Sequence, residues 1–185
     1  TAYEMLRSLV GSEMCIRDRR QAGVKSGDRI AGFVPNMIET IVAMLAATSI
    51  GAIWSSCSPD FGIKGVLDRF GQIEPKILFT ANGYSYNGKE FSSLEKISEI
   101  LDSLPSIEKV IVIPYTEAKA DISAINNAVH YQDFLNPEDN LEIEFEQLPF
   151  DHPLYIMYSS GTTGTPKCIV HGTGGTLIQH LKEHI

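Results

Sequence analysis

Positive charge is scarce in this sequence. Its 15 Lys and Arg residues are outnumbered by 23 Asp and Glu, which gives a formal net charge of −8 at pH 7. Together with the absence of any basic run, this balance argues against a nucleic-acid-binding protein. No apolar run approaches the roughly 18 residues of a membrane-spanning helix, and no segment has the form of a secretory signal. We therefore expect small-molecule substrates, no nucleic-acid partner and no membrane span.

Cysteine is also rare. Cys15, Cys57 and Cys168 lie far apart, and no two of them form a C-x-x-C pair. This spacing argues against a disulfide framework and a zinc site, so we predict reduced thiols, a cytoplasmic location and no metal site among these residues. Internal repeats and low-complexity tracts are absent as well. With 185 residues, 43% of them hydrophobic, the chain is long enough for one domain with a sizeable core.

Residues 1–19 do not fit the rest of the sequence. The stretch from Leu9 to Arg19 has weak periodicity and resembles translated sequencing-adapter read-through. An ordinary amphipathic helix is the alternative interpretation. We expect residues 1–19 to be non-native and assign the domain to residues 20–185.

From Gly27 onward, short apolar runs alternate with segments of helical periodicity. The runs predict strands at 29–34, 52–55, 76–80, 110–113, 154–158 and 168–171. Helices are expected from 38, 59, 94 and 173, between or after these strands. The segments 82–88 and 115–150 are predicted to be a loop and a surface connection. Such alternation is typical of βαβ units, so we predict an α/β fold with a mainly parallel sheet.

The most informative stretch runs from Tyr158 to Lys167 and reads Tyr-Ser-Ser-Gly-Thr-Thr-Gly-Thr-Pro-Lys. Glycines permit close backbone approach, hydroxyls and free N–H groups donate hydrogen bonds, and the lysine adds positive charge, which together favour phosphate binding. The stretch is not a Walker P-loop, because Pro166 precedes the lysine and Cys168 follows it. A polar hairpin turn is the alternative. A serine hydrolase is excluded, since Tyr158 stands where a Gly-x-Ser-x-Gly elbow needs glycine.

This spelling resembles the phosphate-binding loop of the adenylate-forming enzymes, the group of acyl-CoA synthetases, luciferases and peptide synthetases. Further segments look like the acetoacetyl-CoA synthetase branch of that family, more than like acetyl-CoA synthetases. They are residues 51–62, 70–76, 84–89, 169–175 and 180–182. The resemblance covers roughly residues 20–185. One departure is Cys168, where the superfamily commonly has glycine.

The resemblance implies part of the large N-terminal domain of an adenylate-forming enzyme, truncated at its C-terminus. The reaction would convert acetoacetate, ATP and CoA to acetoacetyl-CoA, AMP and diphosphate through an acyl-adenylate, with Mg²⁺ held mainly by downstream residues. A synthetase for acetate or propionate is the alternative. The ribose-binding aspartate, the metal-associated glutamate and the C-terminal catalytic lysine of the family are absent here, so we expect the 185-residue chain alone to be inactive.

The resemblance also assigns roles to individual residues. Lys167 would stabilise the leaving pyrophosphate, and Lys89 would contact the nucleotide phosphate of CoA unless it is an ordinary surface lysine. Trp54 and His171 would lie near the substrate, although a core tryptophan and a structural histidine are the alternatives. The nucleotide-binding set is Ser159, Ser160, Gly161, Thr162, Thr163, Gly164 and Lys167.

Two functions of other classes are consistent with parts of the sequence. Residues 180–184 spell His-Leu-Lys-Glu-His, which matches the H-x-x-E-H motif of inverted zinc proteases. No third ligand is visible, and the preceding glycine-rich loop has no place in that mechanism. A non-catalytic nucleotide-binding module stays open as well.

Overall fold

A computed structural model describes residues 23–135, 145–159 and 164–184. The expectation that residues 1–19 are non-native therefore falls outside the described residues. The same holds for four of the predicted phosphate ligands, Ser160, Gly161, Thr162 and Thr163.

The described residues form nine strands and five helices. The strands are β1 (Arg29–Phe33), β2 (Ile53–Cys57), β3 (Ile77–Ala81), β4 (Gly83–Tyr86), β5 (Lys89–Ser92), β6 (Lys109–Ile113), β7 (Ala128–His130), β8 (Pro153–Ser159) and β9 (Lys167–Gly172). The helices are α3 (Ile38–Ser49), α4 (Ile63–Ile73), α5 (Leu94–Ser103), α6 (Tyr131–Phe134) and α7 (Thr173–His184).

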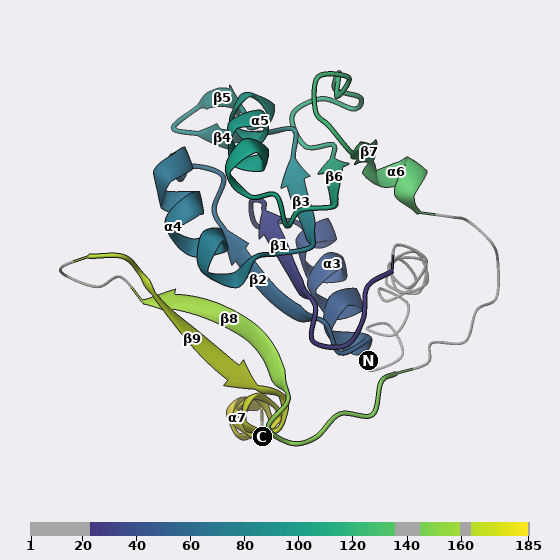
Figure 1. Cartoon of the computed structure of the whole chain (residues 1–185), viewed down its shortest axis with the longest axis vertical. Helices are drawn as coiled ribbons and strands as arrows, with labels where there is room; N and C mark the ends of the chain where they lie inside the picture. The colour runs from purple at the N-terminus through teal and green to yellow at the C-terminus, as the bar shows by residue number, and fades with distance from the viewer. Residues whose placement is uncertain (1–22, 136–144, 160–163, 185) are drawn as a thin grey trace.

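A mixed sheet organises the fold. In the described residues it has seven strands in the order β7-β6-β3-β1-β2-β8-β9. Every neighbouring pair is parallel except β8 and β9, which form an antiparallel hairpin. Helix α3 covers one face, while α4 and α5 cover the other (Figure 1). The predicted α/β fold with a mainly parallel sheet is confirmed.

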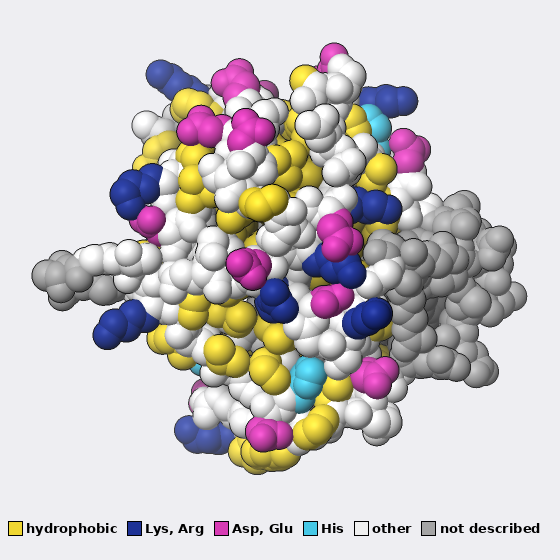
Figure 2. Space-filling model, viewed as in Figure 1, with side chains coloured by type: hydrophobic (Ala, Val, Ile, Leu, Met, Phe, Trp, Pro, Cys, Tyr) yellow, Lys and Arg dark blue, Asp and Glu magenta, His cyan; other side chains and the backbone are white. Residues whose placement is uncertain are grey.

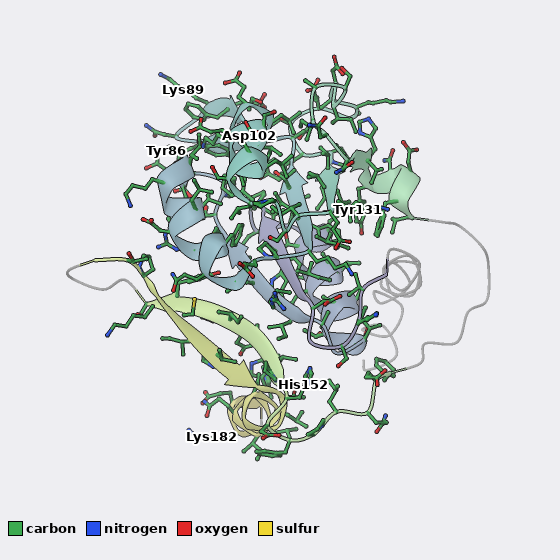
Figure 3. All side chains as sticks on the ribbon, viewed as in Figure 1. Tyr86, Lys89, Asp102, Tyr131, His152 and Lys182 are labelled. Atoms are coloured by element: carbon green, nitrogen blue, oxygen red, sulfur yellow. The ribbon has the colours of Figure 1, made fainter. Side chains whose placement is uncertain are left out.

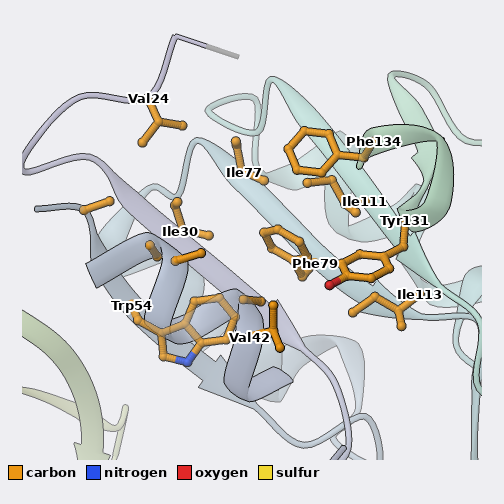
Figure 4. Packing of buried hydrophobic residues seen from close by; sticks show 14 of the residues in the cluster. Val24, Ile30, Val42, Trp54, Ile77, Phe79, Ile111, Ile113, Tyr131 and Phe134 are labelled. Carbon is orange, nitrogen blue, oxygen red and sulfur yellow. The ribbon is translucent and has the colours of Figure 1, made fainter. Parts of the chain in front are cut away.

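The central strands are apolar because both of their faces are covered. All five residues of β3 are buried, as are four of the five residues of β1. On the α3 face, Trp54 packs against Phe79 with their ring centroids 6.2 Å apart, and Phe79 meets Phe134 edge-on (Figure 4). This continuous core holds the carboxyl ends of the parallel strands in fixed relation to one another.

The segment predicted as a loop at residues 82–88 is instead the start of a hairpin, in which β4 pairs antiparallel with β5. Its turn is Asn87-Gly88, and both residues have positive φ, 50° and 74°. An Asn-Gly pair favours the tight turn that matches the twist of two antiparallel strands. The Asn-Gly dipeptide therefore predicts a hairpin turn, although the glycine- and asparagine-rich composition of the whole segment is more typical of a loop.

The interpretation of residues 115–150 as a surface connection is also wrong in part. Strand β7 pairs in parallel with β6, and the short helix α6 places Tyr131 and Phe134 in the core. Elements of three and four residues are too short to produce a detectable period of 2 or 3.6.

The β8–β9 hairpin and α7 lie at one end of the molecule and are much less buried than the rest (Figure 1). Ile156 is the only buried residue of β8. His152, just before β8, joins this unit to the core through a ring nitrogen 2.9 Å from the Gly51 carbonyl oxygen (Figure 3). Figure 2 shows apolar side chains gathered at this end, over α7. The exposed apolar residues of the unit are Met157, Ile169, Val170, Leu177, Ile178 and Leu181.

Candidate nucleotide-binding site

The predicted phosphate loop joins β8 to β9, and its two described ends lie side by side. Ser159 and Lys167 are register partners at the open end of the hairpin, and Gly164 has a φ of +128°, which favours glycine. Strand β8 runs parallel to β2, so the loop leaves the sheet at the carboxyl end of parallel strands. Ligands of open α/β sheets bind at this edge.

Tyr158, the residue before Ser159, is fixed from two sides. The Ser55 hydroxyl on β2 lies 2.9 Å from the Tyr158 hydroxyl, and the Arg69 guanidinium on α4 lies 5.7 Å from the centre of its ring. Burial raises the pKa of Tyr158 above that of an ordinary phenol, despite the opposing effects of the Ser55 hydrogen bond and of Arg69. The phenol is therefore neutral at physiological pH and acts as a fixed polar anchor.

The other end of the loop also contacts α4. Gln72 Nε2 donates a hydrogen bond of 2.8 Å to the Pro166 carbonyl oxygen. Its Oε1 accepts from the Cys168 thiol, with the sulfur 3.5 Å away. Lys167 lies between these two residues and is exposed, and its role as a phosphate ligand stays a prediction.

A second feature is a pocket of about 340 Å³ at the carboxyl ends of β1 and β2, closed on one side by β4. Its lining includes Asn36, Ser56, Cys57, Ser58, Asp60, Tyr84, Ser85 and Tyr86. The lining is polar but mostly uncharged, which suits a planar polar group better than a bare phosphate. Burial raises the pKa of the Cys57 thiol to about 12, with Arg69 opposing the shift, so this cysteine is not a nucleophile at neutral pH.

Lys89 begins β5, directly across the hairpin from Tyr86, which lines the pocket. Its side chain is exposed, and Figure 3 shows both residues at the end of the molecule opposite α7. Lys89 itself does not line the pocket, whose one charged lining residue is Asp60, so a contact between Lys89 and a ligand phosphate stays a prediction.

Lys96 on α5 holds the pocket walls together. Its ammonium group lies 3.1 Å from the Pro59 carbonyl oxygen, 3.4 Å from that of Phe61 and 3.5 Å from the Tyr84 hydroxyl. The first two acceptors belong to the loop after β2, and the third belongs to β4. The sequence offered no sign of this role, because lysine on a helix is ordinarily a solvated residue.

Trp54 and His171 were predicted to lie near the substrate. The indole of Trp54 is 4% exposed and belongs to the core on the α3 face. His171 on β9 is half-buried, and its ring lies 5.0 Å from that of Tyr155. These positions are those of a packed tryptophan and a packed histidine, and their proximity to a substrate stays a prediction.

The H-x-x-E-H motif lies on α7. His180 and His184 have their ring centroids 6.5 Å apart, while Glu183 accepts a hydrogen bond from Gln179 and pairs with Lys182. Within the described ranges, no three His, Cys, Asp or Glu side chains gather to hold a metal ion. The motif is thus an exposed helical surface, and the protease interpretation has no support.

Comparison with known proteins places the chain in a family. The sequence model of the family described as AMP-binding enzyme matches residues 19–184. The chain belongs to the AMP-binding enzyme family. Across the part of the chain that the structure describes, no helix is long and apolar enough to cross a membrane.

Within the AMP-binding enzyme family, the chain is similar to several acetoacetyl-CoA synthetases. The chain is 60% identical to acetoacetyl-CoA synthetase of Gallus gallus, across 99% of the chain and 28% of that protein. It is 52% identical to acetoacetyl-coenzyme A synthetase of Rhizobium meliloti (strain 1021), across 98% of the chain and 28% of that protein. The solved structure of acetoacetyl-CoA synthetase from Streptomyces lividans superposes with a TM-score of 0.85 at 42% identity, covering 97% of the chain and 26% of that structure. The chain thus spans about a quarter of the length of these relatives.

Proposed function

We propose that this chain forms the pyrophosphate-binding part of an ATP-dependent acid–CoA ligase that acts on acetoacetate. The observation that carries the proposal is the hydroxyl- and glycine-rich loop whose ends, Ser159 and Lys167, meet at the carboxyl edge of the sheet. The 60% identity to an acetoacetyl-CoA synthetase favours acetoacetate over acetate or propionate as the acid.

In the first step, a carboxylate oxygen of acetoacetate attacks the α-phosphorus of ATP. The bond from that phosphorus to the oxygen bridging the β-phosphate breaks, and pyrophosphate leaves with the bonding electrons. Negative charge therefore builds on the leaving group, and no nucleophilic side chain is needed. Lys167 and the loop's hydroxyl and N–H groups would stabilise that charge, because donors held in place beforehand need no reorganisation during the reaction.

In the second step, the thiol of CoA attacks the carbonyl carbon of the acyl-adenylate. Acetoacetyl-CoA forms, AMP leaves and the thiol proton is released. The pocket lined by Tyr84 and Tyr86 supports a role in holding the nucleotide end of CoA: its mostly uncharged lining suits the base, and Lys89, which pairs with Tyr86 across the hairpin, suits a phosphate. Trp54 and His171 are retained as residues near the acyl path on the resemblance alone.

Magnesium would accompany ATP as the metal of its phosphates. The part of the chain that the structure describes has no cluster of three or more candidate ligands. On the resemblance, the protein ligands of this ion lie mainly downstream of this chain, and we assign no step to the ion. The free thiols Cys57 and Cys168 support a reducing, cytoplasmic location.

The test is isotope exchange between ATP and pyrophosphate, catalysed by the full-length protein that contains this chain. Exchange that depends on acetoacetate and is much slower with acetate or propionate is the expected result. Exchange that is fastest with another acid would overturn the substrate assignment. ATP binding without exchange for any acid would instead favour a non-catalytic nucleotide-binding module.

A further inference from the structure

Helix α4 contacts both ends of the predicted phosphate loop. The resemblance to adenylate-forming enzymes assigns this helix no role in phosphate binding. Arg69 and Gln72 lie three residues apart, so they share one face of the helix. Arg69 meets the β8 side at Tyr158, and Gln72 meets the β9 side at Pro166 and Cys168. Figure 1 shows the open end of the β8–β9 hairpin beside this helix.

We propose that Arg69 and Gln72 are positioning residues that hold the two ends of the phosphate loop against α4 and thereby fix the place of Lys167. The proposal rests on the proposed function, because it concerns the same pyrophosphate site. Lys167 itself is exposed, whereas its two neighbours in sequence are bound to Gln72. The backbone from which the lysine side chain extends is therefore fixed on both sides.

Arg69 is itself held in place. Its Nη1 donates to the Gly65 carbonyl oxygen at 2.7 Å, and its guanidinium lies 4.5 Å from the centre of the Phe61 ring. The planar cation thus lies near the rings of Phe61 and Tyr158, where cation–π attraction stabilises it. A change in the loop after β2, which contains Phe61, would therefore alter the position of Tyr158 through Arg69.

The side chain of Gln72 gives the thiol of Cys168 a hydrogen-bonding partner. The superfamily commonly has glycine after the loop lysine, and glycine cannot reach a partner on α4. Here the Cys168 thiol meets Gln72 Oε1, while the amide Nε2 of the same side chain donates to Pro166 and, at 2.5 Å, to the Asp68 carbonyl oxygen. One amide therefore uses both of its polar atoms to hold the backbone of α4 and the β9 side of the loop together.

The experiment uses the full-length protein and separates the two half-reactions. Gln72→Leu removes the contacts with Pro166, Cys168 and Asp68 at similar volume. Gln72→Glu keeps the acceptor for Cys168 but loses the donor to Pro166 and Asp68. We expect roughly threefold to tenfold slower acetoacetate-dependent ATP–pyrophosphate exchange in both, since the net worth of a hydrogen bond is about 0.5–1.5 kcal/mol. The KM for pyrophosphate should rise, while transfer of preformed acetoacetyl-adenylate to CoA and the melting temperature should stay unchanged.

Two further variants complete the test. Lys64→Gln, at an exposed pair with Asp68 on the same helix, is the matched control and should behave as wild type. Cys168→Gly should slow exchange on its own but add little to Gln72→Leu, because both remove the same contact. Arg69→Met should slow exchange in the same way as Gln72→Leu.

Wild-type exchange rates in Gln72→Leu, or equal losses in both half-reactions with a lower melting temperature, would overturn the positioning role. Absence of acid-dependent exchange in the wild type would instead refute the proposed function. The two failures are therefore distinguishable.

Discussion

The Ser55 hydroxyl is hydrogen-bonded to the Tyr158 hydroxyl at 2.9 Å and lies at the same distance from the Ile156 carbonyl oxygen. Ser55 is 1% exposed, so these contacts are shielded from water. They join the middle of β2 to the strand that leads into the phosphate loop. A residue in the core of the sheet therefore influences where the loop begins.

Ser55→Ala should weaken this junction. Removing one partner of a buried hydrogen bond costs about 1–3 kcal/mol when the other partner is left unsatisfied. We expect a lower melting temperature together with slower adenylate formation. Tyr158→Phe removes the same hydrogen bond from the other side and keeps the ring beside Arg69, so it should have a similar effect. If Ser55→Ala has the wild-type melting temperature and the wild-type rate of adenylate formation, these hydrogen bonds do not position the loop.

Lys167→Ala should slow adenylate formation by about a hundredfold or more, the usual effect of removing one preorganised charge-stabilising donor. Transfer of preformed acetoacetyl-adenylate to CoA should change much less, since pyrophosphate has already left. Rapid-quench measurement of each half-reaction checks the difference. Lys182→Ala, on the exposed surface of α7, serves as the control lysine. Equal losses in both half-reactions would contradict a role in stabilising pyrophosphate.

Lys89→Ala should raise the KM for CoA by up to about fivefold and leave the KM for ATP unchanged, because an exposed cation contributes only modestly to binding a phosphate. The effect should shrink as salt is added, since exposed charges are screened within about 10 Å at 0.1 M ionic strength. Steady-state kinetics at two salt concentrations provide the measurement. A salt-independent effect, or an equal rise in the KM for ATP, would exclude the proposed contact with the CoA phosphate.

The parts of the fold that were predictable are those with a strong local pattern. The apolar runs of β1, β3 and β6 could be predicted because strands covered on both faces are continuously apolar. The stripe of α4 could be predicted because an amphipathic helix imposes a period of 3.6 on the sequence. The hairpin β4–β5 and the elements β7 and α6 were missed, since their stability comes from pairing with, or packing on, distant segments.

The residues of the candidate site also differ in whether the sequence alone predicts them. Lys167 and the glycines of the loop could be singled out because their local composition favours phosphate binding, and that role stays a prediction. Arg69, Gln72 and Lys96 have no such signature: their partners are Tyr158, Pro166 and Pro59, up to 94 positions away in the chain for Gln72. Residues that act through tertiary contacts become visible only when those contacts are known.

Gly32→Ala should destabilise the protein by about 1–3 kcal/mol, the usual cost of overpacking a core. A methyl group at this position would lie 2.7 Å from Cζ2 of the Trp54 indole, and that ring is itself enclosed by the core. Gly175→Ala on the exposed surface of α7 meets nothing within 4 Å, so it should be neutral or stabilising, by up to about 1 kcal/mol. Thermal melting of the two variants should therefore give shifts of opposite sign or, for the control, no shift.

Cys57 predicts a specific loss of stability at alkaline pH. Burial raises its pKa from 9.0 to about 12, so the folded protein keeps the proton after the unfolded chain has released it. The sign follows from linkage: the stabilisation is complete below pH 9 and is lost progressively as the pH rises towards 12. Between pH 9 and pH 10.5 the loss from this residue is about 2 kcal/mol.

Cys57→Ala should flatten the dependence of urea-unfolding stability on pH over that window, whatever the cost of the cavity at pH 8. Cys168→Ala is the control, because that thiol is less buried and should contribute a smaller slope. Alkylation by iodoacetamide at pH 8 gives an independent measurement: Cys168 should react and Cys57, at 4% exposure, should be protected. Equal reactivity of the two thiols, with an unchanged slope in Cys57→Ala, would contradict a thiol held protonated by burial.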